Sequence, residues 1–231
     1  MDGNMDSSSI KQFLFDLGAD ICGIASIDRF TESPEGFSPL DTLPSCKSVI
    51  VFGNKFLKGT LDCNNTIPYT IVRNMLSDIL DKISINFCNI MDNKDIIAVP
   101  TGTIGPTLYD KITNRYRNIV SVKHAAVLAG LGYIGKNSLL ITPEYGNMVW
   151  LSAVLADIEL EPDEIIKGQC PENCNLCIEN CPVNAIKKDN LEIDQQECIE
   201  YAFRVEEREN FYFKCHKCRT ICPNCLGSEN K

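Results

Sequence analysis

Eight cysteines in the last third of the chain have the spacing of metal ligands. The first run ends just before Pro182 and contains Cys170, Cys174, Cys177 and Cys181. The second run ends just before Pro223, has one cysteine well upstream, and contains Cys198, Cys215, Cys218 and Cys222. Closely spaced cysteines can hold three corners of a [4Fe-4S] cluster while a distant cysteine closes the fourth. The spacing therefore predicts two [4Fe-4S] clusters that transfer single electrons.

A ligand set for each cluster follows from the prolines. In bacterial two-cluster ferredoxins, the cysteine that precedes the proline ligates the other cluster. Applied to this chain, the rule gives cluster A the ligands Cys170, Cys174, Cys177 and Cys222. Cluster B then receives Cys181, Cys198, Cys215 and Cys218. Each of the eight cysteines is used once, which favours the assignment. One departure is the first gap, which holds three residues where the ferredoxin run has two.

The alternative is a pair of zinc sites with four cysteine ligands each. Zinc sites favour paired cysteines and do not need a third cysteine followed by proline, so we favour iron. Cys225 is predicted to be a spare thiol. The remaining cysteines are scattered, and we predict that they are structural thiols: Cys22, Cys46, Cys63 and Cys88.

The residues before the cysteines alternate between helical and strand patterns. Apolar periodicity predicts helices at 9–17, 70–90 and 120–129. Buried strands are predicted at 20–25, 47–52, 95–99, 138–142 and 148–156, the last two joined by a hairpin-like turn at 143–147. The alternation stops in an acidic, proline-containing segment near 157–169. We predict a mixed α/β domain at 1–160 and a ferredoxin-like module at 165–226.

Composition limits the partners and the compartment. The chain has 231 residues, 13 cysteines and a formal net charge of −9. An acidic surface repels a phosphate backbone, so a nucleic-acid partner is not expected, although a local basic patch would change that. No apolar run is long enough to span a membrane, and the N-terminal residues do not resemble a signal peptide. We expect a cytoplasmic protein whose cysteines hold metal, with no membrane partner.

A glycine motif precedes the cysteine runs. Residues Gly130–Gly135 fit the G-x-G-x-x-G pattern of dinucleotide-binding proteins, with Asp157 farther along. That pattern should follow a strand and open a helix, whereas here a predicted helix precedes it and a predicted strand follows. Two alternatives are a helix C-cap with a tight turn, and a backbone that approaches a bulky cofactor closely.

The segment Ala129–Ile141, followed by both cysteine runs, resembles the epoxyqueuosine reductases. The opening residues Leu17–Ala25 are also similar to that family, whose members are cobalamin-dependent iron–sulfur enzymes related to reductive dehalogenases. The resemblance implies an α+β chain, in which a nitroreductase-like α/β corrinoid domain precedes a module with two [4Fe-4S] clusters. It also implies that Gly132, Lys136 and Asn137 contact the corrinoid. The alternative for Lys136 and Asn137 is a polar turn.

The chain departs from that family in two respects. No carboxylate matches the proposed proton donor around Val99 or Ile119, and the chain ends soon after Pro223 without the family's helical repeats. We therefore expect a small-molecule substrate in place of tRNA. Tyr109 and Tyr116 are the candidate proton donors. The histidines, His124 and His216, do not form a cobalt-binding motif.

The leading hypothesis is an iron–sulfur oxidoreductase that passes electrons through two clusters to bound cobalamin. A low-potential donor such as ferredoxin or flavodoxin would supply the electrons. One alternative is a non-catalytic electron-transfer or activator protein that docks a corrinoid protein or another redox partner. Another is a flavin enzyme on the same core.

Overall fold

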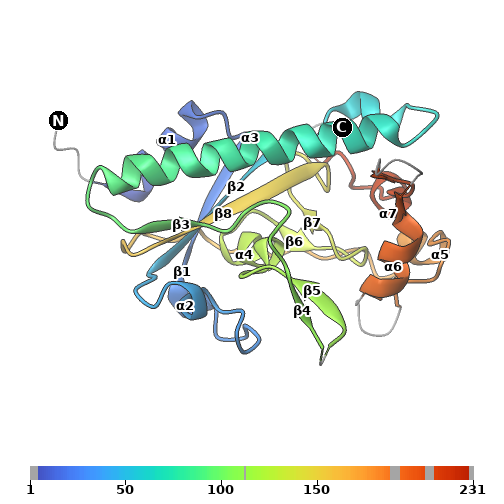
Figure 1. Ribbon diagram of the computed structural model, residues 1–231. Helices are drawn as coiled ribbons and strands as arrows, with labels where there is room; N and C mark the ends of the chain where they lie inside the picture. The colour runs from blue at the N-terminus through green and yellow to red at the C-terminus, as the bar shows by residue number, and fades with distance from the viewer. Residues whose placement is uncertain (1–4, 112, 188–192, 206–210, 229–231) are drawn as a thin grey trace.

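A four-stranded antiparallel sheet forms the centre of the molecule (Figure 1). The computed structural model describes residues 5–111, 113–187, 193–205 and 211–228. The strands lie in the order β1 (Ile21–Ser26), β2 (Ser48–Lys55), β8 (Val149–Ala156) and β3 (Ala98–Pro100). The long strands β2 and β8 pair along their whole length, from Ser48 opposite Ala156 to Lys55 opposite Val149.

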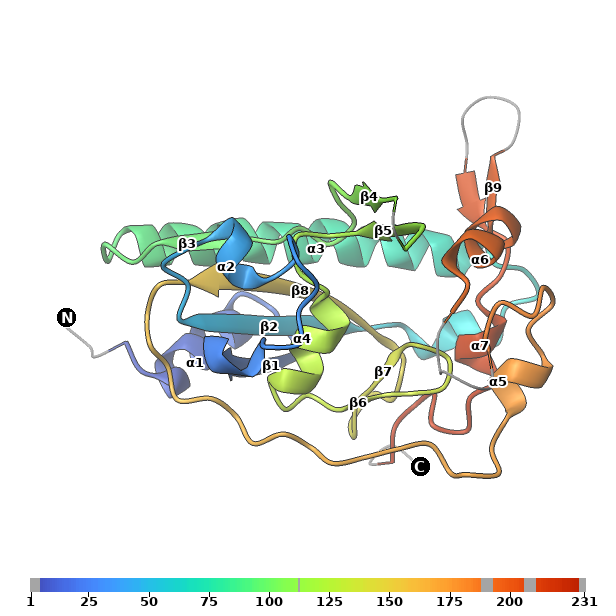
Figure 2. The ribbon, with the colours of Figure 1, turned by 90° about the horizontal axis from the view of Figure 1, so that it is seen from below.

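Helices cover both faces of this sheet, as the ribbon shows from two directions (Figures 1 and 2). On one face lie α1 (Ser7–Asp16) and the long helix α3 (Ile67–Asp92). On the other lie α4 (Val122–Leu128), α2 (Pro39–Thr42) and the short helix η1 (Ile27–Arg29). Because both faces are covered, β2 is apolar on both sides instead of alternating with polar residues. The predicted mixed α/β architecture is confirmed.

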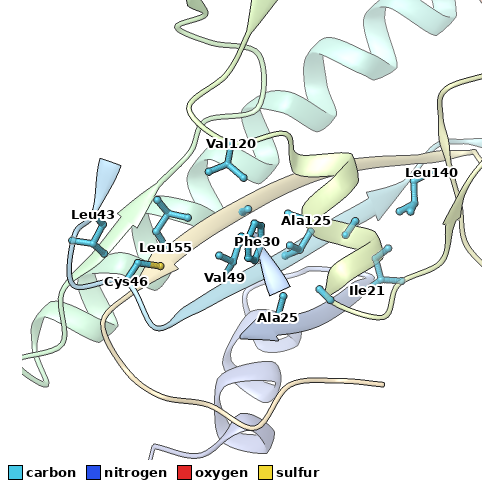
Figure 3. Packing of buried hydrophobic residues seen from close by; sticks show 14 of the residues in the cluster. Ile21, Ala25, Phe30, Leu43, Cys46, Val49, Val120, Ala125, Leu140 and Leu155 are labelled. Atoms are coloured by element: carbon cyan, nitrogen blue, oxygen red, sulfur yellow. The ribbon is translucent and has the colours of Figure 1, made fainter. Parts of the chain in front are cut away.

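Small residues let α4 pack close to the sheet (Figure 3). Ala125, Ala126 and Ala129 are fully buried against the strands. Opposite them, Gly23 of β1 has no side chain, and a Cβ placed there would lie 2.2 Å from the carbonyl oxygen of Ala129. This close contact fixes the position of α4 and of the glycine-rich segment that follows it.

Helix α3 presents a different apolar face to the core from the one its four-residue repeat indicates. Ile71, Met75 and Ile79 are largely exposed, whereas Ile83 and Phe87 are buried. A repeat of four residues drifts around a helix that has 3.6 residues per turn, so the stripe leaves the sheet as it runs toward the N-terminus. Tyr69, Leu76 and Leu80 take its place in the buried face.

Three short hairpins and three short helices extend from this core. The hairpins are β4 (Leu108–Asp110) with β5 (Arg115–Arg117), β6 (Tyr133–Ile134) with β7 (Leu140–Ile141), and β9 (Phe203–Val205) with β10 (Phe211–Phe213). The helices of the cysteine-containing part are α5 (Leu176–Glu179), α6 (Gln195–Ala202) and α7 (Lys217–Thr220). A short 3-10 helix, η2 (Lys58–Leu61), lies between β2 and α3.

The predicted hairpin of β7 with β8 is wrong. The turn itself exists, with a bridge between Thr142 and Gly146, but β7 pairs with β6 while β8 joins the central sheet. The turn instead contacts the end of the described chain. Met148 N donates to Cys225 O at 3.2 Å, and Ser228 N donates to Pro143 O at 2.9 Å.

The acidic segment that follows β8 lies against the edge of β1. Figure 2 shows it running beside the sheet toward α5. Asp163 donates its N–H to Ile24 O at 2.9 Å and accepts from Ile24 N through its carboxylate at 2.8 Å. The same carboxylate forms an ion pair with Lys11. These bonds hold the chain in place between the sheet and the first cysteine.

The contact between Gly23 and α4 gives a stability prediction. Gly23→Ala should lower the free energy of unfolding by about 1–3 kcal/mol, because a methyl group cannot fit against the Ala129 carbonyl without a backbone shift. Gly59→Ala is the matched control, since no atom lies within 4 Å of a Cβ placed there. Chemical denaturation followed by circular dichroism measures both variants. Equal destabilisation by the two changes would contradict the packing of α4 described above.

Candidate redox site

The structure brings the eight cysteines of the two runs into two groups. Burial raises the pKa of the Cys177 thiol, and the negative charges of Cys170, Cys222 and Cys174 raise it further. These four cysteines are therefore neighbours, and we call them group A.

The other four cysteines form group B. Burial raises the pKa of Cys198, and so do the charges of Cys181 and Cys215. The pKa of Cys218 is raised to about 12, first by burial and then by the charges of Cys198, Cys215 and, from group A, Cys177, while Arg219 acts in the opposite direction. Groups A and B have the same members as the ligand sets predicted for clusters A and B.

The donor set of both groups is entirely sulfur, as [4Fe-4S] clusters require. Among the described residues, no three cysteine, histidine or carboxylate side chains surround a point where one metal ion could sit.

Hydrogen-bond donors face the cysteine sulfurs. Lys136 N donates to Cys170 Sγ at 3.3 Å, and Ala185 N donates to Cys181 Sγ at 3.2 Å. Arg219 is buried beside Cys218, and in the described part of the chain its Nη1 has no hydrogen-bond partner. A buried cation and N–H groups directed at sulfur stabilise the anionic form of thiolate-bound clusters. The environment of the cysteines therefore fits two iron–sulfur clusters.

Lys136 and Asn137 bind the cysteine loops. The Lys136 ammonium donates to the carbonyl oxygens of Glu172 at 2.9 Å and Cys174 at 3.0 Å, with longer bonds of 3.4 Å to Pro171 O and Asn175 Oδ1. Asn137 is buried, and its Nδ2 donates to Cys218 O at 3.0 Å. One residue therefore contacts a loop of group A and the other contacts a loop of group B.

A cavity of about 1350 Å³ lies on the other side of the same segment. It exceeds the roughly 300–1,000 Å³ of pockets for drug-sized ligands, so it has room for a macrocyclic cofactor. Its walls come from β5, from α4, from the β6–β7 hairpin and from residues 165–169. Gly168 and Gln169 line it directly before Cys170, which places group A at its wall.

The predicted cofactor contacts and proton donors lie in different places. Gly132, Lys136 and Asn137 do not occur among the described residues that line the cavity. Gly132 has φ +154° and packs on β7, where a Cβ would lie 2.1 Å from Ile141 O. Of the two candidate proton donors, Tyr116 lines the cavity, while Tyr109 lines a smaller pocket of about 200 Å³ beside it.

Several cavity residues were missed by the sequence analysis, above all Arg115, Arg117 and Lys123. A signal for them was present, because residues 111–143 contain five lysines and arginines and no acidic residue in an otherwise acidic chain. Gln195, at the start of α6, was also missed. It accepts from Tyr116 N at 2.7 Å and donates to Tyr116 O at 3.3 Å, so it connects the helix that carries Cys198 to the cavity wall.

Comparison with known proteins identifies the relatives of this chain. An epoxyqueuosine reductase from Bacillus anthracis is 34% identical over 110 residues, which are 44% of this chain. Another, from Leadbetterella byssophila, is 26% identical over 256 residues, covering 94% of this chain and 79% of the relative. These relatives are epoxyqueuosine reductases. The resemblance predicted from the sequence is confirmed, and the relatives are reductases by name. No family model matches the chain.

Solved structures show the same fold. An epoxyqueuosine reductase from Bacillus subtilis superposes with a TM-score of 0.66 and 20% identity over 96% of this chain. A reductive dehalogenase described as B12-dependent superposes with a TM-score of 0.65 and 18% identity, also over 96%. A third structure, with a TM-score of 0.63, 20% identity and 94% coverage of this chain, is an epoxyqueuosine reductase with a tRNA stem loop.

This chain corresponds to part of several relatives. The alignment covers 28% of the Bacillus anthracis protein, and the superposition covers 65% of the Bacillus subtilis chain, 64% of the chain with the tRNA stem loop and 33% of the dehalogenase. The chain therefore spans less than two thirds of these proteins. In the described residues, no helix combines the length and apolar character needed to cross a bilayer.

The bonds of Lys136 predict a role in metal loading. Lys136→Met should remove one cluster and leave the other. The loop that carries Cys170 and Cys174 would lose the hydrogen bonds from the Lys136 ammonium to its carbonyl oxygens. Iron and acid-labile sulfide per chain, together with the electron paramagnetic resonance of the reduced protein, measure the loss. Lys187→Met is the control, since the one bond of its ammonium within the described residues goes to the carbonyl oxygen of Asn184. Full iron content in Lys136→Met would contradict the prediction.

Proposed function

We propose that this chain is a reductase with two [4Fe-4S] clusters at groups A and B and a corrinoid in the cavity. When bound, the clusters supply single-electron transfer and the corrinoid supplies a strongly reducing cobalt centre. The single observation that supports this most is the position of the β6–β7 hairpin. Tyr133, Ile134 and Ser138 line the cavity, whereas Lys136 and Asn137 hold the cysteine loops.

The geometry also suggests the order of electron transfer. Group A adjoins the cavity through Gly168 and Gln169, and burial, followed by the charge of Cys170, raises the pKa of Tyr133 in the cavity wall. Group B lies closer to α3 and α6. His216, between Cys215 and Cys218, stacks on Tyr69 of α3 with the ring centroids 4.1 Å apart, and Cys198 belongs to α6. We propose that a ferredoxin or flavodoxin delivers electrons at group B and that group A passes them to the cavity.

Tyr116 is the better placed of the two candidate proton donors. It lines the cavity, and Gln195 holds its backbone through two hydrogen bonds. Among the described lining residues, the one carboxylate is Glu32, which is exposed to solvent. Tyr116 is also about half exposed, at 53%, but its position at the cavity wall lets its phenol face a substrate there, so we propose Tyr116 for this step.

A small molecule is the proposed substrate, and a nucleic acid is the alternative. The small molecule is supported by the net charge of −9 and by the missing carboxylate near Val99 and Ile119. The alternative is favoured by two observations. A reductase of the same fold contains a tRNA stem loop, and the cavity of this chain is lined by lysines and arginines in spite of the acidic composition.

Cysteine substitution tests the cluster assignment. Cys174→Ala should lose one cluster and leave the other partly intact, because Cys174 is a neighbour of Cys177 in group A and is proposed as a ligand of that cluster alone. Cys225→Ala should keep both clusters, since Cys225 is a neighbour of Cys222 without a proposed ligand role. Anaerobic iron and sulfide analysis separates the two outcomes. Protein that contains zinc and no labile sulfide would refute the iron–sulfur proposal.

Cofactor binding tests the cavity. The anaerobic protein should bind cobalamin and not flavin mononucleotide, as followed by absorption spectroscopy. Gly168→Val should weaken cobalamin binding about tenfold or more, because a Cβ there would lie 2.3 Å from the Tyr133 ring and would push it into the cavity. Gly59→Val is the control, and both variants should keep two clusters. Tight flavin binding with no cobalamin binding would exclude the corrinoid.

A further inference from the structure

The cavity wall carries more positive charge than the composition of the chain predicts. The chain has 22 lysines and arginines against 31 aspartates and glutamates. Five of these cations line the cavity, whereas Glu32 is the one carboxylate among the described lining residues. The five are Arg29, Arg115, Arg117, Lys123 and Lys167. The wall of this cavity is therefore locally positive, although the protein as a whole is acidic.

Arg29 and Arg117 have structural partners. Arg29 donates to the carbonyl oxygens of Leu128 at 2.5 Å and Asp163 at 2.7 Å, and so holds η1 against α4 and the segment after β8. Arg117 pairs with Asp110 across the β4–β5 hairpin at 3.0 Å. Their charges are offset or used in the fold, so they do not by themselves indicate a ligand.

Lys123 has a different environment. Its ammonium donates to Ser138 O at 2.8 Å and to Ser138 Oγ at 2.7 Å, and both acceptors are neutral. Among the described residues no acidic group pairs with it. An ammonium has three N–H donors, so one remains for a ligand. Burial, and after it the positive charge of Arg115, lower the pKa of Lys123 to about 8.

Positive groups lie near Lys123, while the carboxylate of Asp110 pairs with Arg117. Burial lowers the pKa of His124, and the positive charges of Lys123 and Arg117 add to this effect. Lys123 thus lies near Arg115 and His124 at one wall of the cavity. Like charges held together and partly shielded from water destabilise a protein, and an anion bound between them removes that cost.

We propose that Lys123 and Arg115 form a subsite that binds an oxyanion of the substrate, a carboxylate or a phosphate. The proposal rests on the proposed function, because it describes the molecule that is reduced in the same cavity. Tyr116 follows Arg115 in the sequence and also lines the cavity, so the subsite would hold the substrate beside the proposed proton donor. The oxyanion belongs either to a small acid or to a nucleic-acid backbone.

The test uses the anaerobic protein with both clusters and inorganic pyrophosphate as the probe, by isothermal titration calorimetry. Lys123→Gln should weaken pyrophosphate binding about tenfold or more, since it removes a charge-assisted hydrogen bond. Lys94→Gln removes the same charge from an exposed residue that does not line the cavity, and should leave the affinity unchanged. Lys123→Arg should retain most of the affinity.

Two outcomes would overturn the subsite: no pyrophosphate binding by the wild-type protein, or equal affinity in the wild type and Lys123→Gln. Circular dichroism and iron content verify that Lys123→Gln is folded. If Lys123→Gln fails this check, Arg115→Gln replaces it, with the same tenfold loss expected and unchanged affinity again contradicting the subsite.

A second probe distinguishes the two sources of the anion. An RNA stem loop that displaces pyrophosphate, and that binds Lys123→Gln about tenfold more weakly, identifies a nucleic-acid backbone. A stem loop that displaces nothing identifies a small acid. Cobinamide, a corrinoid without the nucleotide phosphate, separates this proposal from the proposed function. Pyrophosphate binding without cobinamide binding would keep the oxyanion subsite and refute the corrinoid.

Discussion

Cysteine side chains held close together and partly out of water are the constraint on which the rest of the structure depends. Burial raises the pKa of Cys177, Cys198, Cys218 and Cys222, so in the absence of metal these groups are neutral thiols. Metal ligation requires that each proton be displaced, which couples metal binding to pH and to folding. Few apolar side chains are buried among the described residues after 170. They are Cys177, Ala185, Ile186 and Ala202. A core of this size does not stabilise a folded unit by itself, and small proteins of this kind are commonly stabilised by bound metal.

The α/β core supplies the remaining support through one segment. Residues 130–141 leave α4 at the Gly23 contact, form the β6–β7 hairpin and donate from Lys136 and Asn137 to the cysteine loops. The opposite side of the hairpin is a wall of the cavity. A shift of the cysteine loops would therefore move the cavity wall, and Gln195 of α6 provides a second connection through the backbone of Tyr116. The hairpin and Gln195 therefore connect the cysteine-containing part of the chain to the cavity.

Local patterns predicted what local chemistry determines. Apolar periodicity predicted α1, β1, β2, α4 and β8 to within a few residues. Patterns failed where distant contacts decide the outcome. The apolar stripe of α3 at Ile71 and Met75 follows the helical repeat but does not face the sheet. Strand β7 pairs with β6 instead of β8. The turn between β7 and β8 forms hydrogen bonds with Cys225 and Ser228 from the far end of the described chain.

Net charge was the least informative quantity, and the reason is physical. Screening limits a charge to the groups within about 8–10 Å, so a ligand responds to its own pocket and not to the sum over the molecule. A chain of net charge −9 has a cavity with five cations and one described carboxylate. The stretch 111–143, with five basic residues and no acidic one, carries three of those five cations, while Arg29 and Lys167 reach the cavity from elsewhere in the sequence. The average over 231 residues conceals such a stretch, and a charge profile along the chain reveals it. Whether an acidic protein repels a phosphate therefore depends on where α4 and β5 place their side chains, which composition does not encode.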